Sequence, residues 1–301
     1  MASPPIVAHR GDRLSGGGEV SWGAWLVIPF VLSTLLLLGS QLVFLRQSVY
    51  VDLPFGKTSE HWSIANYIRI LSDPYYLRTL WLTTWISAVT AAICVVFGFP
   101  IAKTLARLQS RWTTVLLSGV VLTSFITTVI QIFGLIILFR ADGPINGALM
   151  ALKLIDRPFA LIGSSAGVVL GLVYTSFGFA VMLMYGVVRT IPVLLDEAAA
   201  IHGASRMRVL IRVVLPLSAP GLVVGFLTIF NTSMGAFTSA ALLGGGRIIT
   251  VPVLIQRTML LDVKYGMAGA LAALLLLFVV ALNLASAFFM QRMHRPRGLA
   301  T

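Results

Sequence analysis

The chain has 301 residues, of which 58% are hydrophobic and only 11% are charged, and its mean hydropathy is +0.95. Such a chain has too little polar surface to cover a water-soluble globule of its size, so the lipid bilayer is the expected solvent. The formal net charge is +12, but the Lys and Arg residues stand in short clusters between apolar runs, which is typical of membrane topology. The composition predicts an all-α membrane protein and argues against nucleic acid as a partner.

Residues that could hold a metal or form a disulfide are few and scattered. The single cysteine, Cys94, lies inside an apolar run, where packing is its expected role. The histidines, at positions 9, 61, 202 and 294, show no ligand spacing such as HExxH. We therefore expect no cofactor and no metal site.

Apolar segments long enough to cross about 30 Å of hydrocarbon recur along the chain. The predicted spans are 22–45, 79–102, 113–139, 163–188, 213–233 and 265–290. The first follows two arginines as a signal peptide would, but it is longer than a signal-peptide core and lacks a small-residue cleavage site, so we expect it to remain as a membrane anchor. These spans predict a multi-pass protein of the inner membrane with six transmembrane helices.

Basic residues cluster in the short second and fourth connections and at both ends of the chain. Because cytoplasmic segments carry an excess of Lys and Arg, we expect both termini to lie in the cytoplasm. The predicted organisation is a cytoplasmic tail at 1–21, a transmembrane domain at 22–290 and a second cytoplasmic tail at 291–301. Outside, an aromatic stretch predicts an interfacial helix at about 62–72, and the Gly-rich run Leu243–Arg247 predicts a loop or re-entrant turn.

Two short motifs resemble catalytic signatures but lack the rest of the pattern. Gly56-Lys57-Thr58 matches the end of a phosphate-binding loop, but Val51 stands where that loop needs its first glycine. The run 163–167 matches GxSxG, yet no strand is predicted before it. Its glycines, with Gly171, instead predict a small-xxx-small face for close helix packing. We expect a protein that is not an enzyme.

One predicted cytoplasmic segment, about 189–216, has a different character. Pro192 suits the first turn of a helix, and the acidic pair Asp196 and Glu197 lies near the positive end of that helix's dipole. Gly203 permits a left-handed turn that would end the helix, and Ser205 can cap a second, basic helix over 206–214, before Pro216. A helix, a sharp turn and a second helix are suited to transmit movement from a cytoplasmic partner, although an ordinary loop with helical character has the same composition.

The same segment resembles a known motif. Glu197-Ala198-Ala199, then Gly203, then Val213-Val214-Leu215-Pro216 is similar to the EAA motif of binding-protein-dependent ABC importer permeases, with Val213 in place of the usual Ile. Gly143 and Asn146 match an external Gly-x-x-Asn pattern of the same family, and the likeness covers roughly residues 60–290. The resemblance implies a type I importer permease fold with the motif docked on an ATP-binding subunit.

Several expectations follow from the resemblance alone. The implied partners are ATP-binding ABC subunits, a second permease subunit forming a homo- or heterodimer, an external solute-binding protein and membrane lipid. The implied coupling residues are Asp196, Glu197, Ala198, Ala199, Gly203, Ala204, Leu215 and Pro216. ATP hydrolysis is expected in the separate nucleotide-binding subunit.

The solute is less defined by the sequence. Gly235-Ala236-Phe237 and Leu242–Gly246 are similar to spermidine/putrescine-type permeases, whereas Thr123, Gln131, Gly178 and Ala240 depart from that pattern. Candidate residues of the solute pathway are Thr127, Thr128, Gln131, Tyr174, Asn231, Ser233 and Phe237. The alternatives are another small solute, such as an amino-acid-like compound, a phosphonate or iron(III), and an ATPase-independent secondary carrier.

Overall fold

The computed structural model describes residues 22–108, 111–123, 125–158 and 161–294. The predicted tail at 1–21 lies outside these residues, and so does 295–301 of the predicted C-terminal tail. The chain divides into two units, residues 1–46 and residues 47–301. In both units the described structure is mainly helical.

The first unit contains most of helix α1 (Trp22–Ser48), which is 27 residues long. At 1.5 Å per residue this helix reaches about 40 Å, enough to cross a bilayer. Its apolar side chains from Val27 onward are largely exposed within the chain, as lipid-facing residues are. The predicted span at 22–45 is confirmed as a membrane-competent helix.

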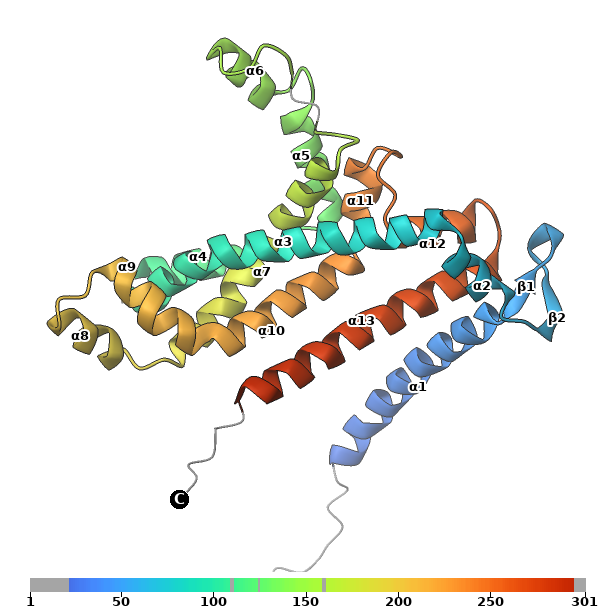
Figure 1. Ribbon diagram of the computed structural model, residues 1–301, viewed down its shortest axis with the longest axis horizontal. Helices are drawn as coiled ribbons and strands as arrows, with labels where there is room; N and C mark the ends of the chain where they lie inside the picture. Colours follow the sequence, from blue (N-terminus) through green and yellow to red (C-terminus); the bar gives the residue numbers. More distant parts are fainter. Residues whose placement is uncertain (1–21, 109–110, 124, 159–160, 295–301) are drawn as a thin grey trace, which may run out of the picture. The chain divides into compact units, whose positions relative to one another are not determined.

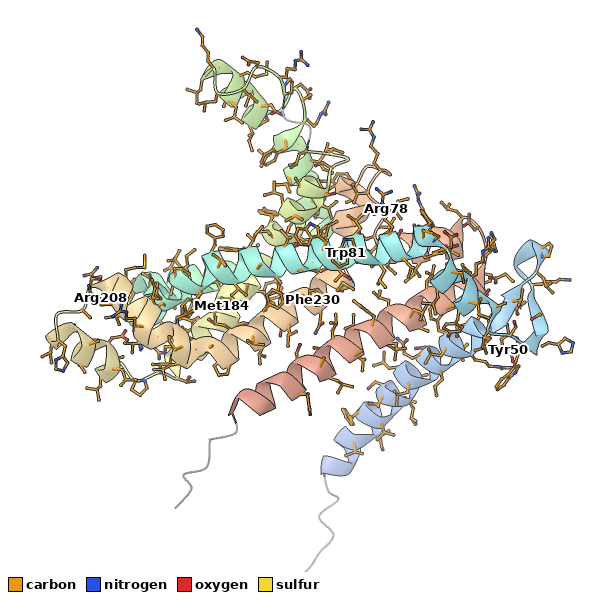
Figure 2. The ribbon with its side chains drawn as sticks, in the orientation of Figure 1. Tyr50, Arg78, Trp81, Met184, Arg208 and Phe230 are labelled. Atoms are coloured by element: carbon orange, nitrogen blue, oxygen red, sulfur yellow. The ribbon has the colours of Figure 1, made fainter. Side chains whose placement is uncertain are left out.

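The second unit is built around three long helices, shown in Figure 1: α3 (Pro74–Arg107), α7 (Ser165–Arg189) and α10 (Leu215–Met234). Helix α3 packs most extensively on α7 and also on α10. Met184 of α7 and Phe230 of α10, labelled in Figure 2, are almost fully buried in the resulting core. Cys94 belongs to the same core, which agrees with its expected packing role.

The two ends of α3 carry different structures. At one end lie α8 (Leu194–Ile201) and α9 (Arg206–Val209), and at the other lie a β-hairpin and α2 (Figure 1). The hairpin pairs β1 (Tyr50–Asp52) with β2 (Thr58–Trp62) in antiparallel register, with the short helix η1 (Pro54–Gly56) between them. Helix α2 (Ala65–Ser72) confirms the helix predicted at 62–72. The hairpin was not predicted, because its five-residue strand is polar and shows no apolar alternation.

Side chains tie this hairpin to the last helix, α13 (Tyr265–His294). The carboxylate of Asp52 accepts hydrogen bonds from the backbone N–H groups of Gly266 (2.7 Å) and Met267 (2.8 Å). It thereby satisfies two of the amide groups that are unpaired in the first turn of any helix. The Asn66 amide donates to the carbonyl of Tyr50 at 2.9 Å, so α2 holds the hairpin from the other side.

The third predicted span, 113–139, is wrong as a single helix. The structure has α4 (Arg111–Thr123), a break, and then α5 (Thr128–Phe139), followed by α6 (Pro144–Ala151). The 13 residues of α4 reach only about 20 Å. The break is stabilised by Gln131, whose amide donates to the carbonyls of Thr123 (3.0 Å) and Ile126 (3.3 Å) and so supplies partners that the interrupted helix lacks.

Six segments of the part of the chain that the structure describes are nevertheless long and apolar enough to cross a membrane, as predicted. Five coincide with predicted spans, and the third is Thr128–Ala151, which comprises α5 and α6. The remaining helices of the described chain are α11 (Thr238–Leu243) and α12 (Val251–Leu260). The first packs on α5 and α7, and the second packs on α13.

The Gly-rich run after α11 is a loop, as predicted. Gly245 and Gly246 have φ values of +54° and +74°, which favour glycine because a Cβ would crowd the following carbonyl. Gly245 also lies against the backbone of Gly163, where a Cβ would be 3.2 Å from the Gly163 Cα. The two loops meet without side chains between them.

Candidate functional site

Helix α8 is the element that carries the EAA motif, and its end is set by Gly203. The N–H of Gly203 donates to the Ala200 carbonyl (2.9 Å) and the N–H of Ala204 donates to the Ala199 carbonyl (3.1 Å). This pair of bonds is the Schellman motif, which requires a left-handed residue at its turn. Gly203 has φ +76°, so the predicted left-handed turn is confirmed. The helix begins at Leu194, and Pro192 therefore lies just before the first turn and not within it.

The second helix also begins as predicted but does not end before Pro216. Ser205 accepts a hydrogen bond from the Arg208 N–H at 3.4 Å and caps α9. The chain then passes through one π-helical turn, η2 (Leu210–Val214), directly into α10. The N–H of Leu215 donates to the Leu210 carbonyl, five residues back. Because proline removes an N–H and clashes with a carbonyl four residues earlier, this wider turn lets the helix continue through Pro216.

An ion pair connects α8 to α3. Arg107 Nε lies 2.9 Å from a carboxylate oxygen of Asp196, and Arg107 Nη1 donates to the Ile191 carbonyl at 3.0 Å. The two side chains are only 15% and 17% exposed, so the contact is partly shielded from water. Asp196 thus faces α3, within the chain, while its neighbour Glu197 is exposed.

The outer face of α8 is apolar, which the sequence reading did not single out. Leu194 and Ile201 are 73% and 85% exposed, and Ala198 is exposed between them. These residues are spaced i, i+4 and i+7, so they share one helix face. That spacing is visible in the sequence and could have identified the face. Of the predicted coupling residues, Ala199 and Ala204 are half-buried, and Leu215 and Pro216 are exposed at the start of α10.

Two of the predicted pathway residues line the same hollow. Gln131 and Tyr174 border a cavity of about 850 Å³ between α3, α4, α5 and α7. Phe97, Phe177 and Phe179 add aromatic rings to its wall, and none of the described residues that line it is charged. Thr127 and Thr128 are exposed at the break before α5 and do not line it. The cavity can therefore offer aromatic faces and one amide to a solute.

The other pathway candidates lie elsewhere. Asn231 of α10 exchanges two side-chain hydrogen bonds with Asn283 of α13, at 3.0 and 3.1 Å. The sequence reading missed Asn283, whose only signal was an amide inside an apolar helix. The Ser233 side chain is buried, and Phe237 is 39% exposed just before α11. The geometry thus gives Asn231 an interhelical contact, not a position beside Gln131.

The Gly-x-x-Asn pattern has a structural role at the end of α5. Asn146 is fully buried, and its amide donates to the carbonyls of Phe139 (3.3 Å) and Arg140 (2.8 Å). A Cβ at Gly143 would lie 2.7 Å from two carbonyl oxygens of α5. Both residues therefore shape the sharp return from α5 to α6.

The GxSxG run forms the start of α7. Ser164 caps the helix by accepting from the Gly167 N–H at 3.0 Å. Gly167 is packed against the Leu161 carbonyl, and Gly171 against Leu243 of α11. Gly163 lies in the preceding loop with φ +80°. We had expected Gly163, Gly167 and Gly171 to form one face on which a second helix packs. Of the three, only Gly171 contacts another helix.

The long membrane-competent helices are the framework of a multi-pass membrane protein, and the capped helix–turn–helix segment has the form that the resemblance to importer permeases implied. Residues 95–297 match the family described as binding-protein-dependent transport system inner membrane component. The chain belongs to that family. It is a multi-pass inner-membrane permease subunit of a binding-protein-dependent importer, a transport component and not an enzyme.

Curated relatives include the spermidine/putrescine transport system permease protein PotB of Salmonella typhimurium strain SL1344. It is 30% identical over 260 residues, which cover 86% of this chain and 88% of the relative. PotB of Escherichia coli strain K12 is 29% identical over 260 residues, with coverages of 86% and 91%. The sulfate transport system permease protein CysW of the same strain is 24% identical over 267 residues, with coverages of 87% and 86%.

Solved structures show the same fold. A chain of the bacterial alginate ABC transporter, in complex with its alginate pentasaccharide-bound periplasmic protein, has a TM-score of 0.75 and 16% identity. The similarity covers 91% of this chain and 96% of that one. A chain of the inward-facing MetNI methionine ABC transporter has a TM-score of 0.57 and 20% identity, covering 74% and 100%. The type I importer permease fold is therefore confirmed.

Proposed function

We propose that this permease subunit imports a polyamine of the spermidine/putrescine class. The observation that carries the proposal is the 30% identity to PotB across 86% of the chain. The cavity beside Tyr174 supports it, because aromatic faces attract organic cations without a fixed carboxylate. Helices α3, α5, α7, α10 and α13 contain no Asp or Glu, so the proposed recognition uses aromatic faces together with neutral polar groups such as the Gln131 amide.

The proposed assembly pairs this chain with a second permease subunit, either identical or different. An external binding protein delivers the solute, and ATP-binding subunits on the cytoplasmic side drive the cycle. In this arrangement one chain supplies only part of the pathway wall. The proposed pathway includes Gln131 and Tyr174, whereas Asn231 holds α10 to α13 beside it.

The proposed docking surface for the ATP-binding subunit is the outer face of α8. Leu194, Ala198 and Ile201 would enter an apolar groove on the partner, with Glu197 at its edge. The ion pair between Asp196 and Arg107 would transmit the partner's movement to α3, because it joins the docked helix to a membrane span.

Two variants of α8 and one control variant test this surface. Ile201→Glu should abolish association with the ATP-binding subunit, and Glu197→Lys should weaken it. Leu152→Glu is the control, because Leu152 is 69% exposed at the end of α6 but remote from α8. Copurification from membranes measures association. If all three variants copurify equally well with the ATPase, α8 is not the docking surface.

The proposed orientation places α8 and both termini in the cytoplasm. In a Cys94→Ala background, single cysteines at Ala200 and Arg111 should resist an impermeant thiol reagent in intact cells, while one at Gly245 should react. The reverse labelling pattern would refute the orientation.

The solute is tested by uptake. Cells that express the chain with its transport partners should accumulate radiolabelled spermidine or putrescine, and Tyr174→Ala should lower uptake more than Tyr174→Phe, which keeps the ring. Uptake of sulfate or an amino acid, with no polyamine uptake, would replace the polyamine assignment and leave the permease class unchanged.

A further inference from the structure

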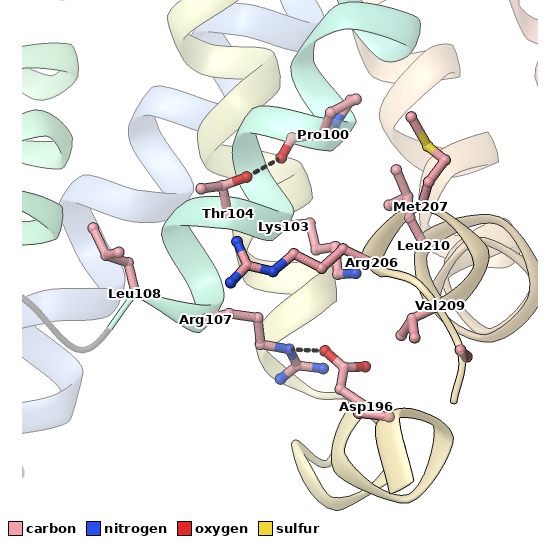
Figure 3. A pocket seen from close by; sticks show the side chains of 12 residues that line it. Pro100, Lys103, Thr104, Arg107, Leu108, Asp196, Arg206, Met207, Val209 and Leu210 are labelled. Atoms are coloured by element: carbon pink, nitrogen blue, oxygen red, sulfur yellow. Dashed lines mark hydrogen bonds and ion pairs between the residues drawn. The ribbon is translucent and has the colours of Figure 1, made fainter. Parts of the chain in front are cut away.

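A second cavity lies behind the coupling segment. It has a volume of about 670 Å³ and is bordered by the last two turns of α3, by α8, by α9 and by the start of η2 (Figure 3). It is separate from the hollow beside Tyr174, with which it shares no lining residue. Neither the docking face of α8 nor the solute pathway makes use of it.

The charged residues of this cavity are predominantly basic. Lys103, Arg107 and Arg206 line it, and Asp196 is the only acidic residue among the described residues of the lining. Asp196 pairs with Arg107, and within the described residues neither Lys103 nor Arg206 forms an ion pair with a carboxylate, so the described lining carries three cations and one anion. Arg107 Nη2 and Asp196 Oδ1 are both buried without a hydrogen-bond partner among the described residues, so this ion pair leaves one donor and one acceptor unsatisfied. The excess in the cavity is therefore one of positive charge.

Apart from Thr104, the rest of the described wall is apolar. Pro100, Leu108, Met207 and Leu210 stand beside the basic side chains, as Figure 3 shows. Next to Pro100 in this wall, Ile101 of α3 is 45% exposed, as lipid-facing residues are. A small soluble anion would use the charges and leave the apolar wall unmatched. A phospholipid uses both, because its phosphate is joined through the glycerol backbone to apolar acyl chains.

We propose that this cavity binds the phosphate group of an acidic phospholipid, with the beginning of an acyl chain against the apolar wall. Basic pockets between membrane helices are suited to such headgroups. The bound phosphate would bridge Lys103 of α3 and Arg206 of α9, and would thereby hold the second helix of the coupling segment to the same span that Asp196 holds. That the lipid comes from the cytoplasmic leaflet rests on the orientation proposed above. The anion site itself does not depend on that orientation.

Lipid binding to the full-length chain tests the proposal without any transport assay. The purified chain in a zwitterionic detergent is titrated with phosphatidylglycerol, with phosphatidylcholine and with inorganic phosphate, and bound molecules are counted by native mass spectrometry. The double variant Lys103→Gln/Arg206→Gln should bind phosphatidylglycerol about 30-fold more weakly, because each basic residue near an anionic headgroup contributes about 1 kcal/mol and 1.4 kcal/mol is tenfold in Kd.

The matched control is Arg208→Gln. Arg208 lies two residues from Arg206 on α9, is exposed and does not line the cavity. Unchanged phosphatidylglycerol binding in this control, together with the loss in the double variant, supports the site. An equal loss in both would mean that general surface charge attracts the lipid, and no loss in either would mean that the cavity is not the site; both results overturn the proposal.

The other titrations distinguish an acidic lipid from a free phosphate ion and from a protein partner. Phosphatidylcholine should bind the wild type and the double variant equally weakly. If inorganic phosphate displaces phosphatidylglycerol at a similar concentration, the site takes a free anion and the lipid assignment is wrong. If addition of the ATP-binding subunits expels the lipid, the cavity is a protein docking surface, which also overturns the proposal.

Discussion

The replacement of Gly203 tests how the coupling segment is built. Its φ is +76°, a region that costs an L-residue about 1–2 kcal/mol. A Cβ at this position would meet no atom within 4 Å, so the cost of a substitution comes from the backbone and not from a clash. The variants should therefore follow conformational preference: Val is the worst, Ala is intermediate, and Asn, which tolerates left-handed backbone, is the mildest.

A cost of about 2 kcal/mol shifts the balance between the observed turn and an alternative by about 30-fold. If the turn opens, the bonds from Gly203 and Ala204 to the last turn of α8 are lost, and the exit angle toward α9 changes. We expect Gly203→Val to reduce transport and the ATP hydrolysis that the loaded binding protein stimulates. The affinity of the external binding protein for its ligand should not change.

The assay is stimulated ATP hydrolysis by the whole importer in proteoliposomes, measured for the Val, Ala and Asn variants. Membrane insertion and the amount of bound ATPase are measured alongside, because a variant that fails to assemble would mimic lost coupling. Equal stimulation in all three inserted variants would refute the reasoning, since it would show that the left-handed turn is not needed.

Three further predictions concern contacts within residues 47–301. Each is tested by the thermal unfolding midpoint of the purified chain. Asp196→Asn should destabilise it by about 2 kcal/mol by leaving Arg107 without its charge partner in a partly shielded site, and the double change with Arg107→Met should recover part of the loss. Asn283→Leu should cost about 1 kcal/mol through the lost amide exchange with α10, and an unchanged midpoint would contradict that contact. Gly221→Ala should cost about 1–3 kcal/mol because its Cβ would overlap Val187, and failure of Val187→Ala to relieve the loss would count against the close packing of α7 and α10.

The sequence by itself determined the class of the protein and the position of most spans. Long apolar runs without charge have few alternatives to a membrane helix, so α1, α3, α7, α10 and α13 follow from composition and length. The coupling segment was also readable, because its signals are local. A serine cap acts on a backbone group three residues away, and the glycine turn at position 203 joins residues five apart or fewer.

Only the tertiary structure decided what depends on distant partners. Residues 113–139 contain no charged residue, so hydropathy alone did not separate α4 from α5, although a Ser/Thr cluster at 123–128 lies at the break that Gln131 stabilises. The inward orientation of Asp196 depends on Arg107, 89 residues away in the chain, and the Asn231–Asn283 exchange joins residues 52 apart. A single sequence shows that such polar groups need partners in the membrane, but which groups meet is decided by the packing of helices that only the folded chain brings together.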